Sequence, residues 1–85
     1  MNIYQVELPN GRIATRKSKM SFTHSVIVKE VIKGIDRDWY VASFSSSKEL
    51  ANKAMSSTQA RYFAPRNNGE FTGTEFQVVE VKAVA

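Results

Sequence analysis

The residues that most resemble a catalytic motif are Ser45 and Lys48, which stand three positions apart at the predicted start of a helix. A lysine one helical turn after a serine can act as its base and make the hydroxyl a nucleophile for acyl transfer. The chain lacks the further motifs that such chemistry needs. Ser46 and Glu49 explain the same stretch better, because a serine followed three residues later by a glutamate forms a capping box. We therefore predict that Ser46 caps the helix and that no residue here is catalytic.

The other residue with catalytic potential is His24, the single histidine of the chain. Acid-base catalysis by one histidine needs a paired carboxylate or a second histidine, and alternation with Val26 and Val28 indicates a packed or rim side chain. The chain has no cysteine, which excludes disulfides and thiolate chemistry, and too few histidines for the usual metal sites. Asp36 and Asp38 match only a fragment of a calcium loop. We expect a non-enzyme without cofactor or metal, and keep His24 as a candidate binding residue.

Basic residues give the strongest indication of a binding partner. The formal net charge is +4, and the cations gather in the predicted second strand and in the helix, where Lys53 and Arg61 lie. The candidate binding residues of the strand region are Arg12, Arg16, Lys17 and Lys19. Even spacing puts Arg12 and Arg16 on one strand face and the two lysines on the other. Two interpretations remain open: a track for a polyanionic partner, and a solvated surface that aids solubility. Both imply that reversing Arg16 and Lys17 leaves stability nearly unchanged.

Alternating and helical patterns predict the elements that position these residues. Strands are expected over residues 3–8, 12–17, 22–32, 39–44 and 75–84, with a tight turn at 9–11. A helix begins after Ser46 and ends before Pro65. A chain of 85 residues forms one domain, 1–85, with one modest core. We predict an α+β fold of order β-β-β-β-α-β, in which one helix packs on one face of a mainly antiparallel sheet of about five strands.

The predicted strand at residues 39–44 has apolar groups on both faces. Alternation places Tyr40, Ala42 and Phe44 on one face and Trp39, Val41 and Ser43 on the other. We expect the helix to bury Tyr40 and Phe44 in the core, rather than to leave them open for base stacking. The opposite face then needs shielding by a second copy of the chain, by a target protein, or by curled sheet and loop. We predict a homodimer and keep Trp39 as a candidate binding residue.

The first residues give an expectation about location. Residues 1–5 lack the charged and apolar regions of a signal peptide, and no apolar run approaches the length of a membrane span. We expect a soluble, cytoplasmic protein.

Four short stretches carry a resemblance to known proteins. They are Thr15-Arg16-Lys17-Ser18 and residues 22–28, 39–45 and 51–54. Their pattern resembles that of small single-domain proteins of phages, plasmids and other mobile elements. The resemblance implies no established activity and no catalytic residues. By analogy of class, compact domains from such elements, anti-CRISPR proteins among them, commonly act by stoichiometric binding to a host complex.

These observations lead to two hypotheses. The leading one is a non-enzymatic binding module, an anti-CRISPR-like inhibitor that docks on a host nucleoprotein or nuclease and competes with nucleic acid. The alternative is a small basic protein that binds DNA or RNA directly. Six candidate residues would meet the partner: Arg12, Arg16, Lys17, Lys19, His24 and Trp39.

Overall fold

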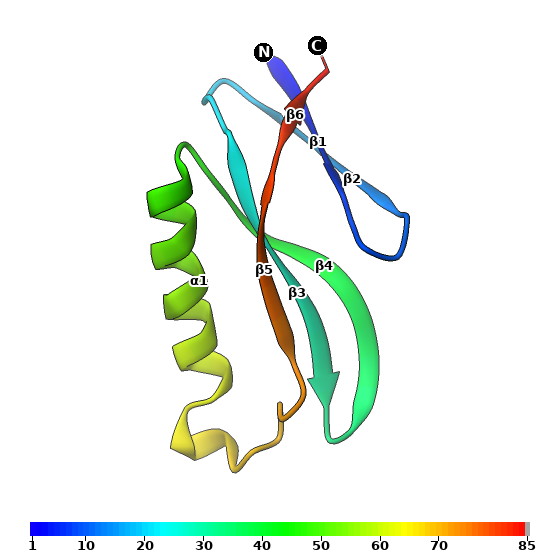
Figure 1. Cartoon of the computed structure of the whole chain (residues 1–85), viewed down its shortest axis with the longest axis vertical. Coiled ribbons are helices and arrows are strands. Elements are labelled where there is room, and N and C mark those ends of the chain that lie inside the picture. Colours follow the sequence, from blue (N-terminus) through cyan, green and yellow to red (C-terminus); the bar gives the residue numbers. More distant parts are fainter. Residues whose placement is uncertain (85) are drawn as a thin grey trace.

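The computed structural model describes residues 1–84, which form six strands and one α-helix (Figure 1). In chain order the elements are β1 (Asn2–Glu7), β2 (Ile13–Ser18), β3 (His24–Ile32), β4 (Ile35–Ser45), α1 (Lys48–Tyr62), the short 3-10 helix η1 (Pro65–Asn67), β5 (Glu75–Glu80) and β6 (Lys82–Ala83). The predicted α+β class with antiparallel strands is confirmed. The single predicted sheet is instead two three-stranded sheets, ordered β2-β1-β6 and β4-β3-β5.

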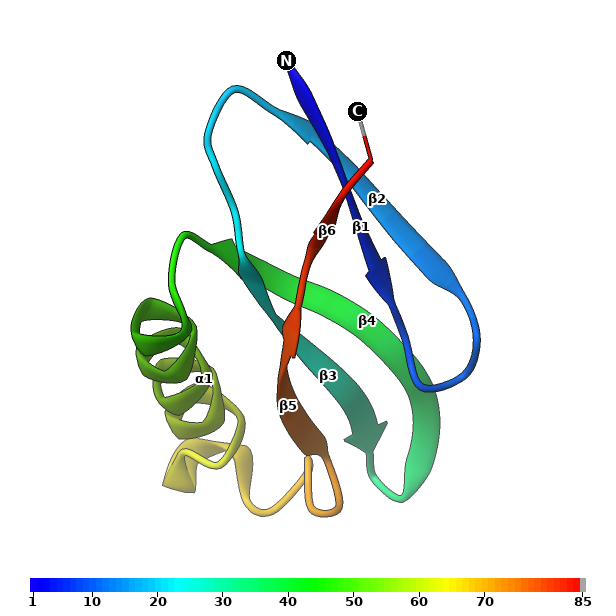
Figure 2. The same ribbon diagram turned by 45° about the horizontal axis from the view of Figure 1, so that its top comes forward.

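The two sheets are joined by the segment that was predicted as one strand over residues 75–84. β5 pairs with β3 and β6 pairs with β1, with Val81 alone between them. At this crossing the Val81 amide donates to the Thr23 carbonyl at 2.9 Å. Figure 2 shows the C-terminal strand running from the sheet beside α1 to the β1–β2 hairpin. A strand that changes sheets makes a corner between them, which is why one predicted sheet becomes two.

The β1–β2 hairpin has the predicted turn, and each strand boundary lies one residue from the predicted one. Its register runs from Asn2 opposite Ser18 to Glu7 opposite Ile13. The turn is closed by the Gly11 amide, which donates to the Leu8 carbonyl at 2.9 Å. Gly11 has a φ of 86°, a backbone angle that glycine adopts without steric cost.

Strand β3 is central and buried on both faces, as its apolar composition predicts. One face packs against α1: Val26, Val28 and Ala51 are fully buried there, joined by Ala54, Met55, Tyr62, Phe76 and Val78. The other face packs against β1: Ile27, Val6 and Leu8 are buried there, joined by Trp39, Val41, Phe44, Val79 and Val81. Full burial of each such aliphatic side chain stabilises the fold by about 1.5–3 kcal/mol. Val78 and Val79 of β5 thus enter opposite cores. This two-sided burial explains why two consecutive residues of one strand are both apolar.

Strand β4 contains a bulge that changes the predicted faces. Ser43 pairs with Val26 but Val41 pairs with Ile27, so Ala42 is one residue too many for the ladder. An extra residue reverses the alternation beyond it. Phe44 therefore lies in the core of Trp39 and Val41, and not on the Tyr40 face where strict alternation placed it.

Helix α1 begins one residue later than predicted. Its N-cap is Ser47, whose hydroxyl accepts from the Leu50 amide at 3.2 Å, so the prediction that Ser46 is the cap is wrong. The reason is that β4 continues through Ser45, which pairs with His24, and the chain needs two residues to leave the sheet. The helix has 15 residues, and no helix within residues 1–84 has the length and apolar character to cross a membrane.

Candidate binding site beside strand β4

The four predicted basic residues differ in how free their charged groups are. Arg16 lies opposite Tyr4 in the hairpin, and its guanidinium stacks over the rings of Phe22 and Phe44, with Cζ 5.2 and 5.1 Å from the ring centroids. Lys17 is exposed, and its neighbour Arg16 has its cationic group engaged within the chain. Arg16 is therefore partly structural, because a cation over an aromatic ring stabilises the fold.

Like Lys17, the other two cations make no such aromatic contact, and one of them lies near an acid. Lys19 is exposed on the connection after β2. Arg12 is also exposed, close enough to Asp38 that its charge helps to lower the pKa of that carboxyl. The Trp39 amide is the largest cause of the lowered pKa, because its hydrogen bond favours the carboxylate, followed by a hydrogen bond from Asn10. The turn of the β1–β2 hairpin thus lies near Asp38 of β4.

The remaining two candidates, His24 and Trp39, lie on opposite faces of the β4-β3-β5 sheet. Trp39 packs with Val6 and Ile27 in the core on the β1 side, so the face that was predicted to need a partner is covered by the chain's own hairpin. His24 lies near the end of β3 with Nδ1 2.8 Å from the Thr23 hydroxyl. The predicted homodimer stays a prediction, but the apolar face that suggested it is accounted for within one chain.

Within the described residues, a pocket lies between β4 and α1. It has a volume of about 400 Å³ and is lined by Tyr40, Val41, Ala42, Thr58, Arg61, Tyr62 and Phe71. A larger hollow of about 530 Å³ lies over β1 and β6, but charges of both signs surround it, from Glu7, Glu80 and Lys82. The pocket beside β4 combines aromatic walls with one cation and contains no lining carboxylate, which makes it the more selective surface.

A chain of three polar groups fixes one wall of this pocket. The Tyr62 hydroxyl donates to a carboxylate oxygen of Glu30 at 2.7 Å, and it also shares a hydrogen bond with the Tyr40 hydroxyl. Burial raises the pKa of Tyr62 far above its usual range, and the hydrogen bonds to Tyr40 and Glu30 raise it further. Tyr62 therefore remains a protonated donor at neutral pH, which suits positioning and binding rather than base or nucleophile chemistry.

Another part of the pocket wall, Phe71, comes from the loop after η1. The Phe71 ring packs edge-on against Tyr62, with ring centroids 4.8 Å apart. The loop is fastened to the end of β3: the Lys33 amide donates to the Glu70 carbonyl at 2.7 Å, and the Val31 amide donates to the Thr74 hydroxyl at 2.9 Å. Phe71 is thus a fixed wall despite its place in a loop.

Arg61 supplies the charge of the pocket. Its side chain is exposed, and it forms no salt bridge with an aspartate or glutamate of residues 1–84. The three salt bridges of this part of the chain instead join Lys29 to Asp36 and Glu75, and Lys33 to Glu70. A guanidinium that is free to form two parallel hydrogen bonds is a ready site for a carboxylate or phosphate.

The pocket also borders a sheet edge. In the β4-β3-β5 sheet, β4 has one neighbouring strand among the described residues, so its other side presents backbone N–H and C=O groups without a sheet partner. Tyr40 and Ala42 lie on this edge and line the pocket at the same time. The site therefore offers side-chain and main-chain contacts together.

Sequence reasoning placed Tyr40 on the helix-covered face, but the prediction that the helix buries it in the core is wrong, because Tyr40 is 38% exposed. Tyr62, Phe71 and Glu30 were missed as site residues. Tyr62 lies at helical spacing near the end of the predicted helix, and Phe71 lies between glycines outside every predicted strand and helix, so neither carries a local signal of a site. Comparisons with protein-family models, with curated proteins and with solved structures each found no match. Among residues 1–84, no three histidine, aspartate or glutamate side chains are grouped as metal ligands.

Proposed function

We propose that the chain is a non-enzymatic binding module, an inhibitor of the kind found in phages and mobile elements, that docks on a host nucleoprotein or nuclease and competes with nucleic acid. The observation that carries this proposal is the pocket beside β4. Aromatic walls, an open strand edge and Arg61, which has no salt bridge within residues 1–84, meet there. Aromatic residues and arginine are the side chains most enriched among the residues that dominate protein-protein binding energy.

The state of the polar groups in the pocket supports binding over catalysis. Tyr62 holds its proton, and the Glu30 carboxylate accepts a hydrogen bond from it. The Thr58 hydroxyl donates to the Ala54 carbonyl at 2.8 Å, so it is engaged with its own helix. The side chains of Tyr62, Glu30 and Thr58 are thus committed to holding the pocket in shape.

Direct binding of DNA or RNA is the second candidate, favoured by one observation. Tyr40 is 38% exposed and lines the pocket together with Arg61, an arrangement that can stack a base and hold a phosphate. Against it, the basic strand offers less than its sequence suggests, because Arg16 is stacked on two aromatic rings.

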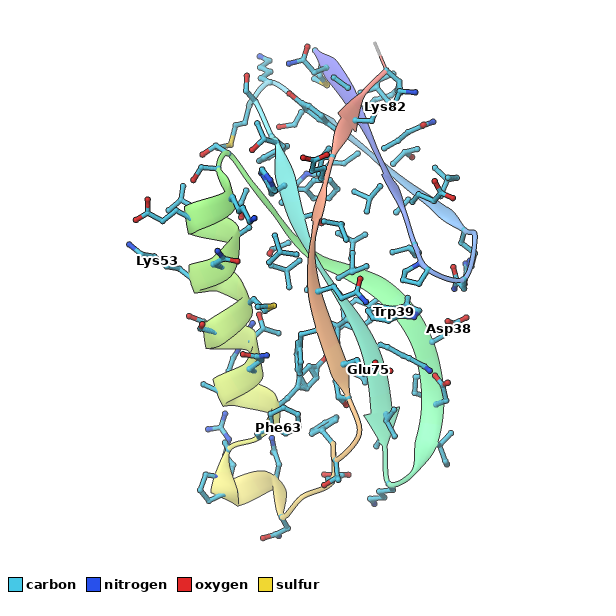
Figure 3. All side chains as sticks on the ribbon, viewed as in Figure 1. Asp38, Trp39, Lys53, Phe63, Glu75 and Lys82 are labelled. Atoms are coloured by element: carbon cyan, nitrogen blue, oxygen red, sulfur yellow. The ribbon has the colours of Figure 1, made fainter. Side chains whose placement is uncertain are left out.

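Two charge reversals on the same helix test the proposal. Arg61 lines the pocket, whereas Lys53 projects from α1 away from both sheets (Figure 3). Tagged wild-type protein, Arg61→Glu and Lys53→Glu would be used to capture partners from a bacterial lysate, with identification by mass spectrometry. We expect wild type and Lys53→Glu to capture the same protein in stoichiometric amount and Arg61→Glu to lose it. Equal loss in both variants, or no captured protein, would contradict the proposal.

A salt titration separates the two candidates. Direct phosphate contacts make affinity for bare duplex DNA fall by about 0.9 log units per contact for each log unit of salt. We expect no shift of a labelled duplex or single strand at low salt. A shift with that steep dependence, reduced in Arg61→Glu, would replace the protein-binding proposal with the nucleic-acid one.

A further inference from the structure

The free edge of β4 and the pocket beneath it define how a partner would be held. A strand added to this edge would lie about 4.8 Å from β4, and its successive side chains would point to opposite faces of the sheet. Those on the same face as Tyr40 would turn toward α1 and into the pocket. Main-chain hydrogen bonds would supply affinity, and the pocket would select side chains.

The usable part of this edge is short. Toward the β3–β4 turn the ladder is irregular a second time, between Lys29 and Val31, and Asp38 there has a φ of 67°. Asp36, Arg37 and Asp38 are also exposed charges, which discourage unspecific pairing of strand edges. The Trp39 amide donates to the Asp38 carboxylate and the Ser43 carbonyl accepts from the Ser25 hydroxyl, so the open stretch is residues 40–42, directly beside the pocket.

The charges of the pocket decide what it selects. Arg61 has no acidic partner within residues 1–84, while the Glu30 carboxylate is engaged by Tyr62. The other lining side chains are neutral, and they include the rings of Tyr40, Tyr62 and Phe71. A volume of about 400 Å³ is small, so it admits one or two side chains. The matching occupant carries one apolar or aromatic side chain and one carboxylate.

We propose that an extended, acidic peptide segment of the partner adds to β4 as a further strand, with an apolar side chain in the pocket and an aspartate or glutamate two residues away on Arg61. Side chains two residues apart on a strand share a face and are separated by about 6.6 Å, which fits the two contacts on one surface. This inference rests on the proposed function, because it specifies how the same site takes a protein partner.

A second copy of the chain is a poorer occupant of the same edge. Tyr40 is the middle residue of β4, whose bounds are Ile35 and Ser45, so a twofold pairing of two β4 strands would centre on the pocket. The Arg61 residues of both copies would then meet near the axis, and like charges in contact are destabilising. A flexible segment, in contrast, can follow the twist that the Ala42 bulge gives to the edge.

A display library of random twelve-residue peptides tests this inference. We expect selection on wild-type protein to enrich sequences with an apolar or aromatic residue and an acid two positions apart. Affinity of a selected peptide, measured by fluorescence anisotropy, should fall about tenfold or more for Arg61→Glu and stay unchanged for Lys53→Glu. Replacing the acid of the peptide by lysine should restore part of the binding to Arg61→Glu.

The strand-like mode has its own readout. We expect N-methylation of alternate peptide amides to abolish binding and methylation of the intervening amides to have little effect. Amide hydrogen exchange within residues 40–42 should slow on binding. Selected peptides that bind without these effects, selection that yields no acidic consensus, or a single-stranded oligonucleotide that displaces every peptide would each overturn the inference. A dimer detected by light scattering that no selected peptide dissociates would also overturn the inference.

The outcomes also separate this inference from the proposed function. If lysate capture depends on Arg61 but no peptide is selected, the partner docks by a folded surface, so the strand-addition inference fails and the proposed function stands. If peptides bind as described but the lysate yields no protein, the mode of binding is right and the proposed function fails.

Discussion

The Tyr62 hydroxyl donates a hydrogen bond to the Glu30 carboxylate at 2.7 Å, which ties the last residue of α1 to β3. Thirty-two positions separate the two residues in the chain. The contact fixes the C-terminal end of the helix over the sheet and holds the Tyr62 ring against Phe71 and Phe76. Both the stability of the fold and the shape of the pocket therefore depend on it.

The first prediction concerns this hydroxyl. Tyr62→Phe should lower the free energy of unfolding by about 0.5–1.5 kcal/mol, because it removes one hydrogen bond of a half-buried network. Urea denaturation gives the measurement, and Tyr40→Phe, at a more exposed ring, should cost less. Equal costs would mean that the Glu30 contact contributes nothing of its own.

From the raised pKa of Tyr62 we predict a loss of stability at alkaline pH. The pKa of Tyr62 is raised in the folded chain, so the folded state keeps a proton that the unfolded state releases above the ordinary value of 10.0. The contribution is complete below that pH and declines as the pH rises above it. The stability difference between wild type and Tyr62→Phe should therefore shrink above pH 10.0. A constant difference across that range would contradict the raised pKa.

The helix cap gives a matched pair of variants. Ser47→Ala should lower the free energy of unfolding by about 0.5–2 kcal/mol, because the Leu50 amide loses its acceptor. Ser46→Ala should change it by less than about 0.5 kcal/mol, as exposed positions usually do. Thermal denaturation of the two variants side by side decides whether the cap is Ser47. The opposite ranking would restore the assignment expected from the sequence.

Adjacent residues of β2 are predicted to behave differently. Arg16→Glu should lower the free energy of unfolding by about 0.5–2 kcal/mol, since it removes a cation from two aromatic rings. Lys17→Glu should stay within about 0.5 kcal/mol of wild type. The sequence alone predicted that neither reversal matters, so similar melting temperatures for both variants would favour that earlier expectation.

How far the sequence predicts this fold depends on the range of the interactions. The β1–β2 turn, the order of the predicted elements and the antiparallel pairing follow from patterns within a few neighbouring residues. The bulge at Ala42 has no such signature in the alternating pattern, so strict alternation placed Phe44 on the wrong face. The corner at Val81 depends on where β1 lies, which no local pattern contains.

The pocket was hidden for the same reason. Tyr40 and Tyr62 are 22 residues apart, on a strand and a helix, and Phe71 reaches them from a loop. Each residue has an ordinary local explanation, as strand aromatic, helix core or loop residue. Only the packing of α1 across β3 and β4 brings the three rings and Arg61 to one place. The basic residues, in contrast, were conspicuous in the sequence, but the structure engages the guanidinium of Arg16 with two aromatic rings.

The corner at Val81 has a consequence for how the chain is made. Val78 of β5 belongs to the core under α1, and Val79 belongs to the core under β1, so both cores include residues that follow position 74. During synthesis, domains complete their folding only when all of their core residues have left the ribosome. Until β5 emerges, the nascent chain holds two unfinished apolar surfaces around β3, so we expect it to fold in one step late in translation rather than hairpin by hairpin.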